Sequence, residues 1–282
     1  MSNNQTITIC HPDDFHHHAR DGPATASVLV HAYPRFKRCL MMPNLKPPVT
    51  TVKLALEYKD RIMGALKANG QDPKNFQPLM TLYLTDQTSP EEVRQAASLK
   101  NSDGTPTIIA CKYYPAGATT NSAFGVSDVK NLYPVLEEMQ KLGMMLCIHS
   151  EVTHADIFER EPVFIEEIMK PLVEKFPTLK ITMEHISTKE AVNYVLNEAP
   201  YNVKASITPQ HLIYNRNRTL YVILCDYSHK KNLALTIEFD VSSHDVFYRH
   251  AGRWHSTTFV LPANSQGKTN STSISIANDF DS

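Results

Sequence analysis

Two kinds of segment alternate from residue 6 to about residue 211, and this alternation constrains the fold more than any other feature of the chain. Short apolar runs bounded by turn residues are typical of buried strands. Most are followed by longer segments in which apolar side chains recur with the period of a helix. The predicted strands cover 6–10, 38–44, 76–86, 105–115, 144–151, 179–187 and 202–212, and the predicted helices cover 50–70, 89–99, 127–143, 159–176 and 187–198.

Repeated strand–helix units predict a parallel sheet with helices outside it. Seven strands fit an α/β fold of the (β/α)8 TIM-like barrel type, and a doubly wound open sheet is the alternative. No glycine-rich phosphate loop follows a predicted strand, which argues against a nucleotide-binding open sheet. Clear helical stripes end near residue 213, so we expect a barrel that is incomplete or distorted at its eighth strand.

Two predicted helices begin with a capping box, in which a hydroxyl residue is followed three positions later by an acidic one. Ser89 with Glu92 opens 89–99, and Ser187 with Glu190 opens 187–198. We expect Ser89 and Ser187 to be the N-caps of these helices.

Composition excludes several classes of protein. The 282 residues carry a net charge of −1, so no electrostatic nucleic-acid footprint is present. No apolar run approaches the roughly 18 residues of a membrane helix, and the first ten residues do not resemble a signal peptide. We therefore expect a cytoplasmic protein with reduced thiols, because its five cysteines form no C-x-x-C pair: Cys10, Cys39, Cys111, Cys147 and Cys225.

Polar side chains with metal-ligating chemistry follow the predicted strands at their carboxyl ends. In a barrel these ends meet at one mouth, where functional residues lie. A single histidine there is usually a buried, satisfied side chain, but histidines at three strand ends together favour a metal site. The residues concerned are His16, His17, His18, Asn44, Lys112, His149, Glu151, Glu184, His185, Gln210 and His211.

The stretch HPDDFHHHARDG at 11–22 offers two imidazoles to one ion. Side chains alternate between faces along a strand, so His16 and His18 share a face and His17 points away. Imidazole suits zinc and other divalent ions. Lys112 does not fit such a site as an ammonium, because that group has no lone pair.

Six segments resemble the shorter, single-function dihydroorotases of the amidohydrolase superfamily, over roughly residues 7 to 217. The most specific are YPAGATTNS after the lysine and ITPQHL. The six segments are HPDDFHHHARDG, MMPNLKPPVTT, CKYYPAGATTNSAFGVSD, CIHSEVTHADIFERE, MEHISTKEAVNYV and ITPQHLIYNRN.

The resemblance implies an enzyme that interconverts N-carbamoyl-L-aspartate and L-dihydroorotate in pyrimidine synthesis, with two zinc ions at the barrel mouth. The first zinc would be bound by His16 and His18 and the second by His149 and His185. Lys112 would be carboxylated by CO2 and bridge both ions, which accounts for a lysine at this place.

The resemblance also assigns the substrate contacts. Arg20 and Asn44 would hold the substrate carboxylate, and Thr119 and Thr120 would lie in a loop that closes over the substrate. The alternatives are an ion pair from Arg20 to Asp21 or Asp14, and an ordinary surface turn for the two threonines.

The resemblance stops after Asn217. The family's eighth strand ends in an aspartate that binds the first zinc and moves the proton, within a stretch like G-T-D-S-A-P-H, and no such stretch is present. Asp240, with His244 four residues later, is our candidate for it, and Asp226 is the alternative. We therefore divide the chain into a barrel portion (1–217), a divergent region that completes the barrel (218–262) and a disordered tail (263–282).

Two other functions remain open. An inactive dihydroorotase-like protein would keep the fold and serve as a partner or scaffold. Another cyclic amidase, such as a hydantoinase, would share the ligands and differ in the substrate contacts. A small-molecule substrate and a homodimer are further expectations from the family, with no nucleic-acid or membrane partner.

Overall fold

The computed structural model describes residues 11–208 and 259–261. Its strands are β1 (Asp13–His17), β2 (Arg38–Met41), β3 (Gln77–Tyr83), β4 (Ile108–Tyr113), β5 (Met145–His149), β6 (Ile181–Glu184), β7 (Val203–Ile207) and β8 (Phe259–Leu261). Its helices are α1 (Pro23–Ala32), α2 (Val52–Ala68), α3 (Pro90–Ser98), α4 (Tyr133–Leu142), α5 (Arg160–Phe164), α6 (Lys170–Lys175) and α7 (Lys189–Asn193). Short turns of other helix types are η1 (Pro73–Asn75), η2 (Val129–Leu132), η3 (Ile165–Met169) and η4 (Tyr194–Glu198).

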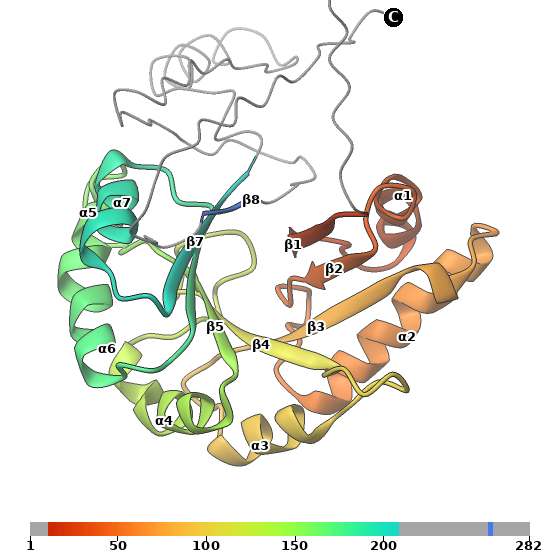
Figure 1. The fold of residues 1–282 in the computed structure, drawn as a ribbon, viewed down its shortest axis with the longest axis horizontal. Helices are drawn as coiled ribbons and strands as arrows, with labels where there is room; N and C mark the ends of the chain where they lie inside the picture. The colour runs from red at the N-terminus through yellow and green to blue at the C-terminus, as the bar shows by residue number, and fades with distance from the viewer. Residues whose placement is uncertain (1–10, 209–258, 262–282) are drawn as a thin grey trace, which may run out of the picture.

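The first seven strands pair in chain order, each parallel to the next, and the helices cover the outside of the curled sheet (Figure 1). The predicted parallel α/β barrel is therefore confirmed over these strands. The eighth strand departs from the pattern, because β8 pairs antiparallel to β7, with Ala205 opposite Leu261. The distortion expected at the eighth strand is present in this form.

Two apolar clusters show which face of each strand looks inward. The larger cluster joins strand residues such as Cys39 and Met41 to residues of every long helix, so it fills the layer between sheet and helices. Apart from Met42, which directly follows β2, the smaller cluster consists of strand residues, among them Leu40 and Leu79, with Phe15 packed against it. It therefore lies on the inner face of the curled sheet. Neighbouring residues of β2 thus alternate between the two faces.

Helix α1 is missing from the prediction, although its signal is present in the sequence. Pro23 occupies the first turn, where its missing N–H has no intrahelical acceptor. The buried positions follow the i, i+3, i+4, i+7 spacing of an amphipathic helix: Thr25, Val28, Leu29 and Ala32. Threonine and alanine at two of these positions weaken the apolar stripe, and this explains the omission.

One of the two predicted N-caps is correct. The Ser89 hydroxyl accepts from the Glu92 N–H at 3.2 Å, whereas the Glu92 carboxylate accepts from the N–H of Val52 on the neighbouring helix. The N-cap expected at Ser187 is wrong, because the Thr188 hydroxyl caps α7 by accepting from the Ala191 N–H. The reason is tertiary: the Ser187 N–H instead donates to the buried Glu161 carboxylate.

The other boundaries agree with the predictions to within three residues when the adjoining η turns are counted. Strand 6–10 and the end of strand 202–212 lie outside the described residues, and the first strand described is β1. The helix expected at 159–176 is observed as α5, the π turn η3 and α6 in succession. No helix of the described part combines the length and apolar character that a membrane crossing requires.

Candidate metal and substrate site

Four histidine side chains from three strand ends meet at one end of the sheet. The Nε2 atoms of His16 and His18 lie 3.1 Å apart, and His149 Nδ1 lies 3.3 Å from His185 Nε2. The rings of His16 and His185 join the two pairs, with centroids 4.9 Å apart. The structure therefore brings together all four predicted histidine ligands, which are separated by up to 169 positions in sequence (185 − 16).

An irregularity in β1 sets the direction of the first two histidines. The register between β1 and β2 shifts between Asp14 and His17, as in a β-bulge. Phe15 packs on the inner cluster and His16 also contacts inner-face groups, whereas His17 turns back to the Asp14 carboxylate. His17 thus points away from the histidine cluster, as the alternation along HHH predicts.

Lys112 lies at the buried base of this cluster. Its ammonium donates to the Glu184 carboxylate, and neither side chain is more than 1% exposed. The other oxygen of Glu184 lies 3.0 Å from His16 Nδ1. Glu184 is therefore part of the site, although the resemblance assigned it no role and it was named only among the polar side chains at strand ends. Its signal is the position of an acidic residue at the end of the apolar run LKITME, directly before His185.

Burial makes two imidazoles of this cluster harder to protonate, as the pKa values of His18 and His149 show. Burial, followed by the charge of His16, lowers the pKa of His18 well below its usual range. Burial also lowers the pKa of His149 and outweighs the opposing effect of Glu151. For Glu184, burial acts to raise the pKa, but His16 and Lys112 outweigh it and hold the pKa at about 2. Neutral imidazoles beside a carboxylate are good ligands for divalent ions.

The donor atoms are close enough to share an ion. One nitrogen of His16, one nitrogen of His185 and one carboxylate oxygen of Glu184 all lie within 4.8 Å of one another. Glu151 orients the His149 ring, since one of its carboxylate oxygens lies 2.9 Å from His149 Nε2. Carboxylates commonly fix metal-binding histidines in this way. The residues present therefore fit a metal centre.

Backbone strain gathers around the same site. In the described part, the non-glycine residues with positive φ are Arg20 (63°), Asn121 (57°) and His185 (44°). Such conformations cost energy and persist where the surroundings enforce them, often at functional sites. Ser206 on β7 enforces one of them, because its hydroxyl accepts from the His185 N–H at 3.0 Å.

The predicted substrate loop lies against the end of β2. Asn44 donates through its side chain to the Thr120 carbonyl at 3.1 Å, and Asn121 donates to the Asn44 carbonyl at 2.9 Å. Asn44 is 4% exposed, and its side-chain oxygen has no hydrogen-bond partner among the described residues. The structure thus joins Asn44 to the segment of Thr119 and Thr120, and leaves a buried acceptor free there.

Arg20 is half-buried and near the cluster, where its charge helps to lower the pKa of His18 after burial and His16. Asp21, one of its two alternative partners, pairs with Arg61 at 2.9 Å. The substrate role of Arg20 and its alternative, an ion pair with Asp14 or Asp21, both stay predictions. Asp240 and Asp226 lie outside the described residues, as do Gln210 and His211.

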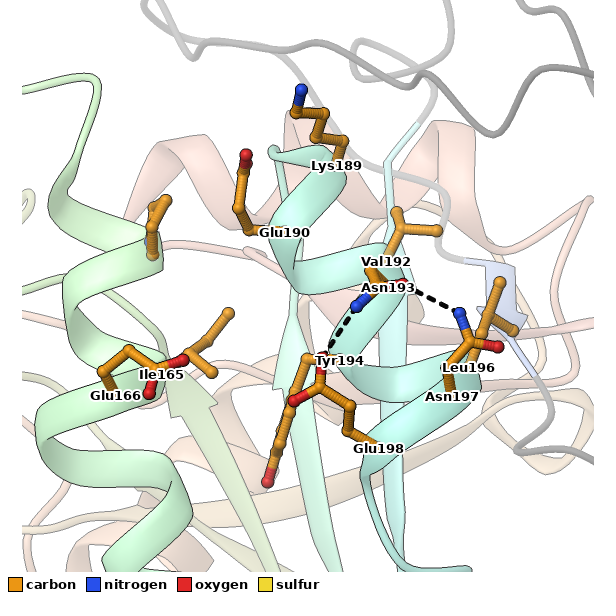
Figure 2. Close-up of a pocket in the computed structure, with 11 residues that line it drawn as sticks. Ile165, Glu166, Lys189, Glu190, Val192, Asn193, Tyr194, Leu196, Asn197 and Glu198 are labelled. Carbon is orange, nitrogen blue, oxygen red and sulfur yellow. Dashed lines mark hydrogen bonds between the residues drawn. The ribbon is translucent and has the colours of Figure 1, made fainter.

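A groove of about 630 Å³ lies elsewhere, on the outer helical layer (Figure 2). Helical residues from α5 and η3 form one wall, and residues from α7 and η4 form the other. None of the predicted site residues lines it. The candidate site is therefore the histidine cluster at the strand ends, and not this groove.

Comparison with known proteins gives concordant matches. The chain is 50% identical over 215 residues to a protein of Aromatoleum aromaticum named dihydroorotase, covering 76% of this chain and 59% of the relative. It is 52% identical over 216 residues to a rice protein named dihydroorotase, mitochondrial, covering 76% of this chain and 51% of the relative. No protein-family model matches the chain.

Solved structures agree with these relatives. The crystal structure of dihydroorotase from Campylobacter jejuni superposes with a TM-score of 0.65 and 34% identity, covering 75% of this chain and 58% of that one. The chain therefore spans between about half and three fifths of the length of the proteins that it matches. Over the part that these matches cover, the chain belongs to the dihydroorotase family of the amidohydrolase superfamily.

Proposed function

We propose that the protein is a zinc-dependent dihydroorotase, a cyclic-amide hydrolase that interconverts L-dihydroorotate and N-carbamoyl-L-aspartate in de novo pyrimidine biosynthesis. The observation that carries this proposal is the convergence of His16, His18, His149 and His185 around the buried Lys112. The names of the relatives at about 50% identity support the same reaction.

Two zinc ions would be held at this cluster, the first by His16 and His18 and the second by His149 and His185. When bound, the ions would supply Lewis-acid polarisation of the ring amide and would lower the pKa of water. Lys112 would bridge them as a carbamate. Its complete burial beside the histidine cluster supports this role, which would require Lys112 to give up its ion pair with Glu184.

The chain's own groups would bind and enclose the substrate. The Arg20 guanidinium would bind the substrate carboxylate through two parallel N–H hydrogen bonds, and Asn44 would contribute to the same contact. The free Asn44 side-chain oxygen would accept a hydrogen bond from a ring N–H. The segment of Thr119 and Thr120, already joined to Asn44, would exclude water when it closes.

Opening the ring moves a proton onto the leaving nitrogen, and this step needs a carboxylate that gives and takes that proton. We propose Asp240 for it, with Asp226 as the alternative. General acid–base help of this kind is typically worth about 10² to 10⁴ in rate. Replacing Asp240 with asparagine should therefore remove activity by about that factor and leave zinc bound by the histidines.

Hydrolysis of L-dihydroorotate by the full chain, supplied with zinc and bicarbonate, tests the proposal. We expect turnover that is lost in His16→Ala and in Asp240→Asn. If activity were lost in Asp226→Asn but kept in Asp240→Asn, Asp226 would be the residue that transfers the proton. If the folded, zinc-loaded protein turned over no faster than the His16→Ala variant, the proposed enzymatic activity would be contradicted.

That negative result would favour the second candidate, an inactive dihydroorotase-like partner or scaffold. The end of the resemblance after Asn217, without a stretch like the family's G-T-D-S-A-P-H, favours this candidate. A hydantoinase is disfavoured, because relatives at about 50% identity are named dihydroorotase. Assaying hydantoin beside dihydroorotate separates the two substrates.

A cytoplasmic location and a homodimer complete the proposal. The free, buried thiols of Cys39, Cys111 and Cys147 support a reducing compartment. Cell fractionation tests the location, and a mitochondrial signal, as in the name of the rice relative, would contradict it. Sedimentation of the purified protein tests the dimer.

A further inference from the structure

A second group of metal-ligating side chains lies on the other face of the sheet from the four histidines. It consists of Asp14 and His17 on β1 and Cys39 on β2. Cys39 packs in the layer between sheet and helices, whereas its neighbour Leu40 packs on the inner face. Asp14 is paired directly with Cys39 in the register of the two strands. The group is therefore separated from the histidine cluster by the sheet itself.

The three side chains are close enough to share one ion. A carboxylate oxygen of Asp14, a ring nitrogen of His17 and the Cys39 sulfur all lie within 4.8 Å of one another. The Asp14 carboxylate lies 3.0 Å from His17 Nδ1 and accepts from the His16 N–H at 3.0 Å. None of the three residues is more than 3% exposed.

The Nδ1 atom of His17 faces Asp14, and the other ring nitrogen of His17 is unpaired among the described residues. Within the described part of the chain, His17 Nε2 is buried and has no hydrogen-bond partner. Leaving a buried polar atom unpaired destabilises the fold, so native proteins rarely keep one without a purpose. The proposed enzyme uses neither His17 nor Cys39, so its chemistry gives neither residue a reason to be there.

We propose that Asp14, His17 and Cys39 form a third metal site, for zinc or a similar thiol-binding divalent ion. Carboxylate, imidazole and thiolate are all zinc ligands, and the thiolate selects against magnesium and calcium. The fourth tetrahedral position is left to a water molecule. On binding, the Cys39 S–H bond breaks, its electron pair forms the bond to the ion, and the proton leaves to solvent.

The expected role of this ion is structural. It joins the first two strands at the point where Asp14 faces Cys39, at one edge of the parallel sheet. Because all three side chains are buried, the ion would enter while β1 docks on β2 and would then exchange slowly. Adding metal to folded protein is therefore a poor test, and the ion should be supplied during expression.

Expressing the full chain in cobalt-supplemented minimal medium tests the site through its sulfur ligand. Thiolate-bound Co²⁺ has a near-ultraviolet charge-transfer band, and the proposed dizinc site has no thiolate ligand, so that site cannot produce the band. We expect the band in the parent protein and about one fewer cobalt per chain in Cys39→Ser, which should lack the band. His17→Gln should lose the same equivalent.

Two matched controls show which side chains produce the charge-transfer band. Cys111→Ser changes another fully buried thiol, on β4, and should keep it. The double variant His16→Ala/His149→Ala should also keep it, so failure of the proposed enzyme and failure of this site are distinguishable. A parent protein without the band, a band that survives Cys39→Ser, or a band lost in Cys147→Ser instead would overturn the proposal.

A second measurement needs no variant at Cys39. Cadmium-113 NMR of protein expressed with cadmium separates thiolate-bound ions from ions bound by nitrogen and oxygen alone. We expect one thiolate-type resonance, which should persist in Cys111→Ser. Resonances of the nitrogen–oxygen type alone would overturn the site even if Cys39→Ser does not fold.

Discussion

Lys112 donates from its ammonium to the carboxylate of Glu184, and this ion pair is closed off from solvent beneath the histidine cluster. Removing one partner of a buried pair leaves an uncompensated charge, at a cost of about 3–5 kcal/mol. His16 remains as a second contact of Glu184 at 3.0 Å, so we expect the lower end of this range. Lys112→Met should therefore destabilise the metal-free protein by about 3 kcal/mol.

Urea unfolding in the presence of a chelator measures this loss. The double variant Lys112→Met/Glu184→Gln removes both charges and should recover most of the stability, because the pair is then replaced by neutral groups. A single variant that unfolds at the same urea concentration as the parent would contradict the buried ion pair.

The parallel fold and the histidine cluster could be predicted because each depends on a local pattern. Strand–helix alternation determines a parallel sheet, and parallel strands bring their carboxyl ends together, so His16, His149 and His185 were expected to meet. The ion pair of Lys112 with Glu184 could not be predicted, because it joins β4 to β6 and depends on which face each residue presents. The N-cap at Thr188 was missed for the same reason, since a distant carboxylate, that of Glu161, binds the Ser187 N–H.

Glu151 should control zinc affinity through His149. Its carboxylate lies 2.9 Å from His149 Nε2, which fixes the ring and raises its basicity. Replacing such a partner typically costs 10- to 100-fold in metal affinity. We expect Glu151→Gln to weaken one zinc by about that factor in competition with a chromophoric chelator. Glu167→Gln is the matched control, because Glu167 pairs with the exposed His154 in the same manner; equal losses in both variants would refute the role of Glu151.

Glu161 should make stability fall as pH rises. Burial raises its pKa from 4.5 to about 7, despite hydrogen bonds from Ser187 and Thr188 that favour the charged form. Between about pH 4.5 and pH 7 the folded protein then binds more protons than the unfolded chain, so the free energy of unfolding decreases with pH in this window. The contribution is fully present below pH 4.5 and is lost as pH rises through about 7.

Glu161→Gln removes this titration and should flatten the pH dependence of the melting temperature over the same window. The variant should also be less stable at low pH, because glutamine has one accepting oxygen whereas both oxygens of Glu161 accept from Ser187 or Thr188. Glu166→Gln, a change at an exposed residue five positions later, should leave the slope as it is in the parent. An unchanged slope in Glu161→Gln would show that this carboxyl titrates below the window.

Asn121 should hold the segment of Thr119 and Thr120 against the end of β2. Its side chain donates to the Asn44 carbonyl at 2.9 Å, and its own carbonyl accepts from the Tyr83 hydroxyl at 3.1 Å. Its φ of 57° suits glycine and asparagine and is unfavourable for alanine. Asn121→Gly therefore removes one hydrogen bond, worth about 1 kcal/mol, whereas Asn121→Ala adds a backbone cost of roughly 1–2 kcal/mol.

Hydrogen exchange of the amides of residues 119–122 measures how often this segment opens. We expect exchange to rise about fivefold in Asn121→Gly and by at least a further fivefold in Asn121→Ala, following the two free-energy costs. Asn69→Ala is the matched control, because the Asn69 amide donates to the Ala26 carbonyl at 3.0 Å in another part of the molecule. If glycine and alanine at position 121 gave the same exchange rates, the backbone conformation would not contribute, and the side-chain bond alone would hold the segment closed.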